Sequence, residues 1–390
     1  MSFINNHTHI FNAECVPNAF LSNYKMPGFL ANIIRKAVHK KVLRKIILFI
    51  LNRIPGKING LQLRRYAALI DVASNRSQED IFRILMANYP SEAQFVILTM
   101  NFDHMTGGVP DENYSHYLTQ LHEVLDVKKT FDKKALPFLF IDPRMGGDEC
   151  LKLVKEYFDP LKQKGLAGIK LYPSLGYYPF HPNMEKVYAY AEQYEIPILT
   201  HANKDGGAYY AGRFLPAMFT YLSFNETPET KAYLDKTLIR FPSFNDPRNY
   251  ANILMHPVLY TDVLRKFPKL KLCLAHFGGD EEVLTQDKAK PDDYNWTTSI
   301  KKLMDEFKNV YTDVSFMLAS STASKRVLKD IGPASPYRNR ILFGTDFFLT
   351  APLANDEKLT NDFFKIAAPY KELLTNTNPV NFLRSAFFQP

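Results

Sequence analysis

Two histidines near the amino terminus, His7 and His9, have the spacing of a metal-binding pair. They lie at the end of a predicted strand over residues 3–9, and side chains two residues apart on a strand point to the same face. Two neutral imidazoles that converge in this way supply half of a zinc or similar transition-metal site. Isolated pairs also occur on surfaces and in loops, so further ligands are needed before the pair indicates a metal.

Three other predicted strands end in residues that can bind a metal or transfer a proton. The runs IPILTH, LKLCLAH and RILFGTD end at His201, His276 and Asp346. Each residue alone could be a hydrogen-bonded polar group at a strand end, and Asp346 alone could cap a helix. In a barrel of parallel strands, however, the carboxyl ends of all strands surround one mouth. The coincidence therefore predicts one site built from residues far apart in the sequence.

The segments that must position these residues alternate between short β-rich runs and longer helical patterns, which is typical of parallel βαβ units. Eight candidate strands lie at residues 3–9, 94–101, 136–142, 167–172, 196–201, 271–276, 310–315 and 340–346. Helical candidates include residues 148–164, 183–194 and 298–308. Eight strands are what a closed barrel requires, so we predict an α/β fold of the (β/α)8 TIM type.

Two stretches are too long for a simple crossover, approximately residues 10–90 after the first strand and 202–267 after the fifth. Both follow strands whose ends are assigned to the site, so we expect these insertions to cover the barrel mouth. The sequence shows no internal repeat, low-complexity tract or linker. Residues 1–390 are therefore interpreted as a single barrel domain with helical insertions after strands 1 and 5.

Much of the formal net charge of +8 comes from one segment. Basic and apolar residues over residues 31–57 recur at helical spacing, which predicts an amphipathic helix. Such a helix can bind a membrane surface or an acidic partner, or can pack on the barrel with its lysines in water, and the second interpretation is favoured. No nucleic-acid-binding module is recognisable, so we expect no nucleic-acid partner.

Cysteine content and hydropathy indicate a reducing compartment. Cys15, Cys150 and Cys273 suggest neither a disulfide framework nor a thiolate metal site. No apolar run is long enough to cross a bilayer, and the first residues lack the basic and apolar regions of a signal peptide. We therefore expect a cytoplasmic protein without a transmembrane segment.

The set of motifs resembles the amidohydrolase superfamily, and more closely its branch that includes aminocarboxymuconate semialdehyde decarboxylase. The resemblance is carried by HTH on the first strand, histidine on the fifth and sixth strands and GTD on the eighth. Further similarities are FIDPR at 140–144, GIKLYP at 168–173, FPKLKLCLAHFGG at 267–279 and NPVNFL at 378–383. They span nearly the whole chain outside the two insertions. As a set they are specific for the superfamily, though not for one reaction.

The resemblance implies that one divalent metal, commonly zinc with manganese as the alternative, is bound by His7, His9, His201 and Asp346. Asp346 would both bind the metal and accept a proton from the water that the metal activates. His276 would lie beside the metal without binding it, and would polarise a substrate carbonyl or transfer a proton. The expected catalytic residues are therefore His276 and Asp346.

Lys170, on the fourth predicted strand, leaves the metal count open. In two-metal members of the superfamily a carbamylated lysine on this strand bridges the ions, whereas GIKLYP also resembles the single-metal branch. One metal is favoured, with two only if Lys170 is carbamylated. A Lys170 that binds no metal needs a carboxylate partner or a substrate anion, because burial of an unpaired charge is costly.

The residues expected to bind substrate follow the third, fourth and fifth strands. They are Arg144, Tyr172, Asn203 and Lys204. Aromatic and cationic groups together suit a small-molecule substrate with a carboxylate or a ring. Arg144 has the alternative of capping a helix end or pairing with Asp142. A homodimer is only a family-level expectation.

Three functions remain open from the sequence. Hydrolysis of an amide, ester or lactone by metal-activated water leads, because the residues supply water activation and a second polarising group. Non-oxidative decarboxylation of a carboxylated ring or semialdehyde is second, since the nearest branch includes a decarboxylase. A barrel scaffold with a basic membrane-surface helix is third, although a complete set of metal-binding residues would be unusual in a scaffold.

Overall fold

The computed structural model describes residues 3–16, 71–73, 77–105, 116–159, 165–205, 227–238, 247–290, 293–350 and 355–390. Its strands form one eight-stranded sheet in the order β1-β2-β3-β4-β5-β6-β7-β8, and every neighbouring pair is parallel. The strands are β1 (Phe3–Thr8), β2 (Ala93–Leu98), β3 (Ala135–Phe140), β4 (Gly168–Leu171), β5 (Ile198–Thr200), β6 (Leu272–Leu274), β7 (Val310–Asp313) and β8 (Ile341–Leu342). All eight predicted strands are confirmed, with bounds that differ by a few residues.

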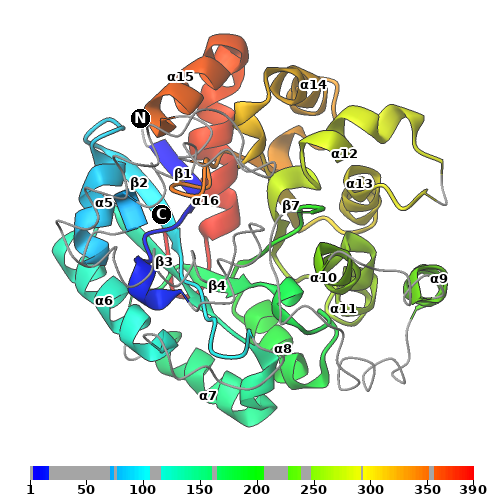
Figure 1. Cartoon of the computed structure of the whole chain (residues 1–390), viewed down its shortest axis with the longest axis horizontal. Helices are drawn as coiled ribbons and strands as arrows, with labels where there is room; N and C mark the ends of the chain where they lie inside the picture. Colours follow the sequence, from blue (N-terminus) through cyan, green and yellow to red (C-terminus); the bar gives the residue numbers. More distant parts are fainter. Residues whose placement is uncertain are drawn as a thin grey trace.

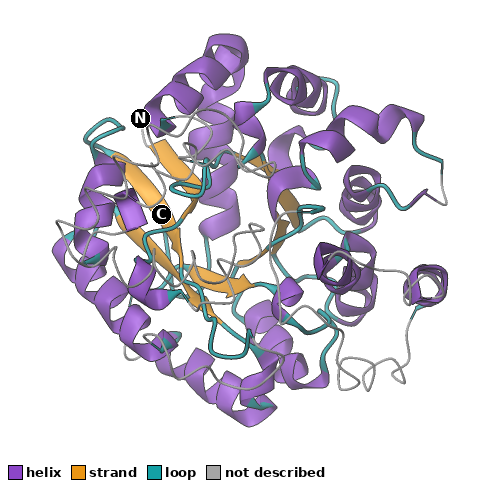
Figure 2. Cartoon of the chain, in the orientation of Figure 1, coloured by secondary structure: helices purple, strands orange, loops and turns teal. Residues whose placement is uncertain are grey.

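The sheet closes where the segment after β8 returns to β1. The backbone N–H of Asn6 donates to Phe343 O at 2.9 Å, and that of Asp346 donates to His7 O at 2.9 Å. The strands therefore surround a common axis, and most of the helices drawn lie outside them (Figure 2). The predicted (β/α)8 TIM-type barrel is confirmed.

Helices follow the strands around the outside of the barrel (Figure 1). They are α5 (Gln78–Met86), α6 (Tyr117–Thr130), α7 (Gly147–Tyr157), α8 (Glu185–Gln193), α9 (Pro228–Leu238), α10 (Pro247–Met255), α11 (Tyr260–Lys266), α12 (Asp280–Thr285), α13 (Trp296–Glu306), α14 (Ser321–Ile331), α15 (Asp356–Ala367) and α16 (Asn378–Leu383). The three predicted helices are present with shifted ends. For example, α13 begins at Trp296, two residues earlier than predicted, because the side chain of Asn295 caps it by accepting from the Thr298 N–H.

Apolar side chains alternate between the inside and the outside of the barrel. Val96 and Leu98 of β2 join an interior cluster with Phe138, whereas Phe95 and Ile97 join the layer that packs against the helices. This alternation follows from the two-residue period of a strand. Phe382 of α16 also belongs to the interior cluster, so α16 packs against one end of the barrel. The opposite end carries the polar residues.

The long connections contain helices in their described parts. The β5–β6 connection includes α9, α10 and α11, so the predicted insertion after strand 5 is helical in its described part. Within the β1–β2 connection, α5 precedes β2, while the basic segment 31–57 lies outside the described residues. No helix in the described ranges is both long enough and apolar enough to span a membrane.

Candidate metal centre

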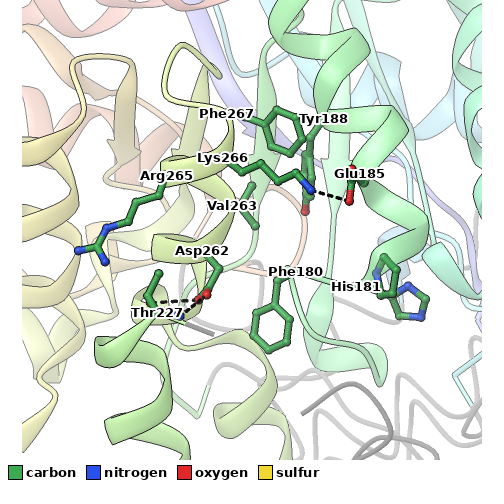
Figure 3. Close-up of a pocket in the computed structure, with 11 residues that line it drawn as sticks. Phe180, His181, Glu185, Tyr188, Thr227, Asp262, Val263, Arg265, Lys266 and Phe267 are labelled. Carbon is green, nitrogen blue, oxygen red and sulfur yellow. Dashed lines mark hydrogen bonds and ion pairs between the residues drawn. The ribbon is translucent and has the colours of Figure 1, made fainter. Parts of the chain in front are cut away.

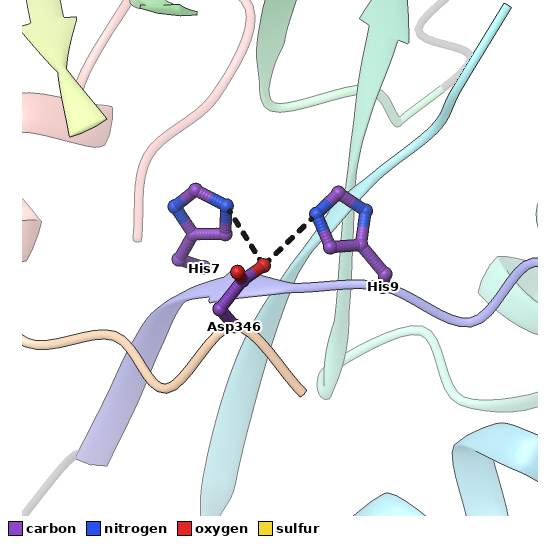
Figure 4. Close-up of side chains that lie close together, drawn as sticks. All are labelled: His7, His9 and Asp346. Atoms are coloured by element: carbon purple, nitrogen blue, oxygen red, sulfur yellow. Dashed lines mark ion pairs between the residues drawn. The ribbon is translucent and has the colours of Figure 1, made fainter. Parts of the chain in front are cut away.

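The polar residues predicted from the strand ends gather at the mouth of the barrel. His7 is the penultimate residue of β1, and His9 directly follows the strand. The Nε2 atoms of His7 and His9 lie 3.4 and 3.2 Å from Oδ1 of Asp346, which follows β8 (Figure 4). His201 follows β5, His276 follows β6, and all these side chains are buried.

Two of these residues have an unusual backbone conformation. His276 has φ +66° and Asp346 has φ +61°, in the left-handed region that side chains other than glycine rarely adopt. Such conformations cost of order 1–3 kcal/mol each and persist only where the surrounding structure enforces them. At Asp346 the enforcing contact includes its N–H bond to His7 O. Two residues whose side chains enter the mouth are therefore among the described residues with this kind of backbone strain.

Hydrogen bonds fix which nitrogen of His7 and His9 carries the proton. Nδ1 of His9 lies 3.0 Å from the carbonyl oxygen of Leu98, which can only accept, so Nδ1 is the donor. Nδ1 of His7 likewise donates to Oδ2 of Asp313 at 2.9 Å. In the neutral imidazoles both Nε2 atoms are then unprotonated, and their lone pairs face the carboxylate of Asp346.

The protonation states favour metal binding. Burial lowers the pKa of His7, His9 and His201 below the ordinary histidine value, which keeps their imidazoles neutral. Burial alone would raise the pKa of Asp346, but the adjacent His7 and the contact with His9 hold it below its usual range. The centre therefore presents neutral nitrogens and an ionised oxygen, the forms in which these groups bind metals.

Three buried atoms in the mouth have no hydrogen-bond partner, namely Nε2 of His7, Nε2 of His201 and Oδ1 of Asp346. Buried polar atoms are nearly always paired, so each one that is not needs an explanation. All three are electron-pair donors, which a divalent cation with nitrogen and oxygen ligands satisfies at once. The residues present thus fit a metal.

The described residues contain two groups whose possible ligand atoms all lie within 4.8 Å of one another. One consists of His7, His9 and Asp346, and the other of His7, His276 and Asp313. His201 belongs to neither, although its Nε2 is buried and its Nδ1 lies 3.0 Å from Nε2 of His276. The first group contains three of the four predicted ligands.

Asp313, at the end of β7, is a functional candidate that the sequence analysis missed. Besides the bond from His7, its carboxylate accepts the N–H of His276 at 2.9 Å and that of Ser315 at 3.0 Å. Burial alone would raise the pKa of Asp313, but the electrostatic interaction and hydrogen bond with the His7 imidazole hold it below its usual range. A carboxylate that orients a metal-binding histidine raises the basicity of that ligand. The signal was the run VYTD, which ends like the other ligand-bearing strands.

Lys170 on β4 is almost fully buried, and within the described ranges its Nζ has no hydrogen bond or ion pair. Nζ lies 5.6 Å from the ring centroid of Tyr172. Burial lowers the pKa of Lys170 to about 8, a shift that Asp346 and Asp313 partly oppose. At neutral pH the ammonium form is still the major one, so a positive charge lies inside the barrel.

The residues predicted to bind substrate have different surroundings. The guanidinium of Arg144 donates to both carboxylate oxygens of Asp142, at 2.8 and 2.6 Å, and to two backbone carbonyls. The structure therefore shows the pairing with Asp142 that the sequence left as the alternative. Lys204 pairs with Glu282 at 2.7 Å and stays partly exposed.

Tyr172 and Asn203 lie closer to the centre. The ring of Tyr172 is 4.6 Å from that of His201. Asn203 is buried and forms a parallel bridge with Gly278. A Cβ atom at Gly279, whose φ is +102°, would lie only 2.2 Å from Oδ1 of Asn203, so the close approach requires glycine there.

A second hollow, here called the outer cavity, lies between α8 and α11 and has a volume of about 430 Å³ (Figure 3). Its charged groups are paired: Glu185 with Lys266 at 2.7 Å, and Asp262 with the N–H of Thr227 at 2.6 Å. None of the candidate metal ligands lines it. The acidic side chains of the outer cavity are satisfied by protein partners and no proposed ligand lines it, so the barrel mouth is the candidate site.

The chain is similar to known proteins in sequence and in fold. A family model described as "Amidohydrolase" matches residues 152–384, more than half of the chain. No curated protein matches the sequence significantly.

Solved structures share the fold. A 5-carboxyvanillate decarboxylase from Novosphingobium aromaticivorans, in complex with manganese and 4-hydroxy-3-methoxy-5-nitrobenzoic acid, is 12% identical with a TM-score of 0.54, over 98% of this chain and 96% of that one. The 5-carboxyvanillate decarboxylase of Sphingomonas paucimobilis is 11% identical, with a TM-score of 0.51. The match covers 98% of this chain and 99% of that chain.

Proposed function

The chain belongs to the amidohydrolase family and is an enzyme, and we propose that it hydrolyses an amide, ester or lactone with one bound divalent metal. The proposed ligands are His7, His9, His201 and Asp346, and the proposed metal is zinc, with manganese as the alternative. The observation that carries the proposal is the set of buried, unpartnered lone pairs on His7, His201 and Asp346.

When bound, the metal lowers the pKa of water toward neutrality and polarises a substrate oxygen. The chain supplies the rest. Ionised Asp346 has an oxygen without a hydrogen-bond partner that can accept the proton of the attacking water. Asp313 holds His7 in the tautomer whose Nε2 is free. The role of His276 as a proton donor or carbonyl-polarising group stays a prediction.

The charges of the centre favour an anionic substrate. A divalent metal and the ammonium of Lys170 outweigh the carboxylates of Asp346 and Asp313 by one positive charge. Both carboxylates are buried, and Lys170 has no partner among the described residues. Because an uncompensated buried charge is costly, a substrate carboxylate would complete the site. We therefore propose a small-molecule substrate that carries a carboxylate.

This excess charge also favours a second candidate, non-oxidative decarboxylation. In that reaction the metal and Lys170 would hold the substrate carboxylate, and a group such as His276 or Asp346 would deliver the proton that replaces carbon dioxide. Decarboxylation is also the reaction in the names of both fold neighbours. Their low identity shows the fold alone, so the two candidates must be separated by experiment.

The test is product analysis after loading with zinc or manganese. Panels of carboxylated lactones, amides and phenols that include 5-carboxyvanillate would be incubated in ¹⁸O-labelled water. Incorporation of ¹⁸O into a new carboxylate supports hydrolysis and contradicts decarboxylation. Release of carbon dioxide together with an organic product that contains no ¹⁸O supports decarboxylation and contradicts hydrolysis. The matched control is Asp346→Asn, which removes the proposed base.

A further inference from the structure

Ser315 lies at the junction of the polar network, two residues after the end of β7, and is completely buried. Its Oγ is 2.9 Å from Nδ1 of His276 and 3.1 Å from Nδ1 of His7. The same hydroxyl forms a short hydrogen bond with Oδ1 of Asp313. One hydroxyl therefore contacts a carboxylate and two imidazoles.

The direction of each hydrogen bond follows from what each atom can donate. An ionised carboxylate only accepts, so the single hydroxyl proton of Ser315 goes to Asp313. The lone pairs of Oγ are then available to His276. The carbonyl oxygen of Ser315, 3.3 Å from Nδ1 of His276, is also only an acceptor. Both contacts favour the proton of His276 on Nδ1, and the shorter one, to Oγ, is the contact that depends on the serine side chain.

The same argument extends to His201. With its proton on Nδ1, neutral His276 has a lone pair on Nε2, which lies 3.0 Å from Nδ1 of His201. That nitrogen of His201 must then donate, which leaves Nε2 of His201 unprotonated. This Nε2 is the buried atom that has no hydrogen-bond partner. The opposite arrangement would protonate it, and would turn a lone pair of His276 toward the carbonyl of Ser315.

We infer that Ser315 is a positioning residue which, with Asp313, fixes the protonation of His276 and His201 so that His201 presents an unprotonated Nε2 to the metal. The inference rests on the metal centre of the proposed function, but it concerns the metal-free chain and no particular reaction. It assigns His276 an effect on metal binding through His201, although His276 is not one of the proposed ligands.

The test compares Ser315→Ala and Ser315→Cys with the wild-type chain. Alanine removes the hydroxyl, while cysteine keeps the side chain's bulk but is a weak acceptor, which guards against loss of folding in one variant. The control is Ser324→Ala on α14, because the Ser324 hydroxyl is buried without a hydrogen-bond partner. Thermal unfolding of each metal-free variant checks that it folds.

Two properties are measured. Long-range ¹H–¹⁵N correlation spectra of histidine-labelled, metal-free protein report which ring nitrogen is protonated, with signals assigned through His201→Gln and His276→Gln. Competition with a chelator gives the zinc dissociation constant. Loss of an outer partner of a metal ligand typically weakens metal binding about 10- to 100-fold, and we expect about 10-fold here because Ser315 acts through two imidazoles.

We expect wild type and Ser324→Ala to show Nδ1–H on both His201 and His276, and both Ser315 variants to show mixed or Nε2–H forms with weaker zinc binding. Unchanged tautomers in both Ser315 variants would overturn the inference, whether or not zinc binding changes. A wild-type chain that binds no metal would instead refute the metal centre. Even then, the spectra decide whether Ser315 sets the protonation pattern.

Discussion

The barrel mouth and the outer cavity both contain charged groups, yet among the described residues it is the mouth that gathers several unpartnered atoms of metal-binding side chains. In the outer cavity Glu185 is paired with Lys266, and Asp262 accepts hydrogen bonds from Thr227. In the mouth, Nε2 of His7 and Oδ1 of Asp346 are buried without a hydrogen-bond partner. Single atoms of this kind also occur elsewhere in the described residues, so the indication comes from several of them meeting on histidine and aspartate side chains at one place.

The largest effect is expected for Asp346→Asn, which removes the anionic oxygen from the centre. Loss of a direct ligand should weaken zinc or manganese binding by more than about 100-fold, above the range typical of outer partners. The affinity is measured by competition with a chelator. The matched carboxylate-to-amide control is Glu185→Gln in the outer cavity, for which wild-type affinity is expected. Equal losses in both variants would remove the contrast between the two regions.

A smaller loss is expected for Asp313→Asn, which weakens the acceptor for Nδ1 of His7. We expect metal affinity to fall about 10- to 100-fold while the site still binds, because every direct ligand is retained. Isothermal titration calorimetry with zinc measures the change. Asp330→Asn is the control, since Asp330 is a buried carboxylate that pairs with Lys301 on the outer helices. An unchanged affinity in Asp313→Asn would show that this carboxylate does not support the centre.

The third effect is on the pH dependence of stability. Burial lowers the pKa of His276 from 6.5 to about 4. Between these values the unfolded chain binds the proton and the folded chain does not, so the metal-free fold loses stability as the pH falls. His276 should account for about 2 kcal/mol of the decrease in unfolding free energy between pH 7 and 5.

Urea denaturation of wild type and His276→Gln at both pH values tests this expectation. The variant should lose less stability than wild type over the interval. The control for removal of an imidazole is His116→Gln, because the side chain of His116 is half-exposed. A decrease in His276→Gln as steep as in wild type would show that His276 is not buried in its neutral form.

The smallest effect is expected in the outer cavity. Lys266→Met breaks the ion pair with Glu185, in which both side chains are more than half exposed. Exposed pairs contribute little, so the unfolding free energy should change by no more than about 0.5 kcal/mol and metal content should not change. Thermal unfolding and elemental analysis measure the two quantities. A loss of bound metal would show that the outer cavity takes part in the site.

The sequence was sufficient for the barrel and for gathering its polar residues. Strand ends could be located because apolar runs such as IPILTH and RILFGTD stop at a polar residue. The barrel architecture then places those ends around one mouth. Asp313 also lies at the end of a strand, but it belongs to no recognised motif, so nothing in the sequence separates it from an ordinary polar residue at a strand end.

The sequence predicted less well which side chains pair with one another. Arg144 pairs with Asp142 only two residues away, so its sequence position fits both a substrate-binding and a structural role. Lys204 pairs with Glu282, which is distant in the sequence. The left-handed conformation of His276 and Asp346 also has no sequence signal, because neither residue is glycine and tertiary contacts enforce it.

The most direct test of the central claim is elemental analysis of the purified wild-type chain after reconstitution with zinc or manganese and removal of unbound ions. The unpaired atoms of His7, His201 and Asp346 predict about one metal per chain at neutral pH. Two metals would contradict the single-metal centre and place Lys170 among the ligands. No bound metal would contradict the account as a whole.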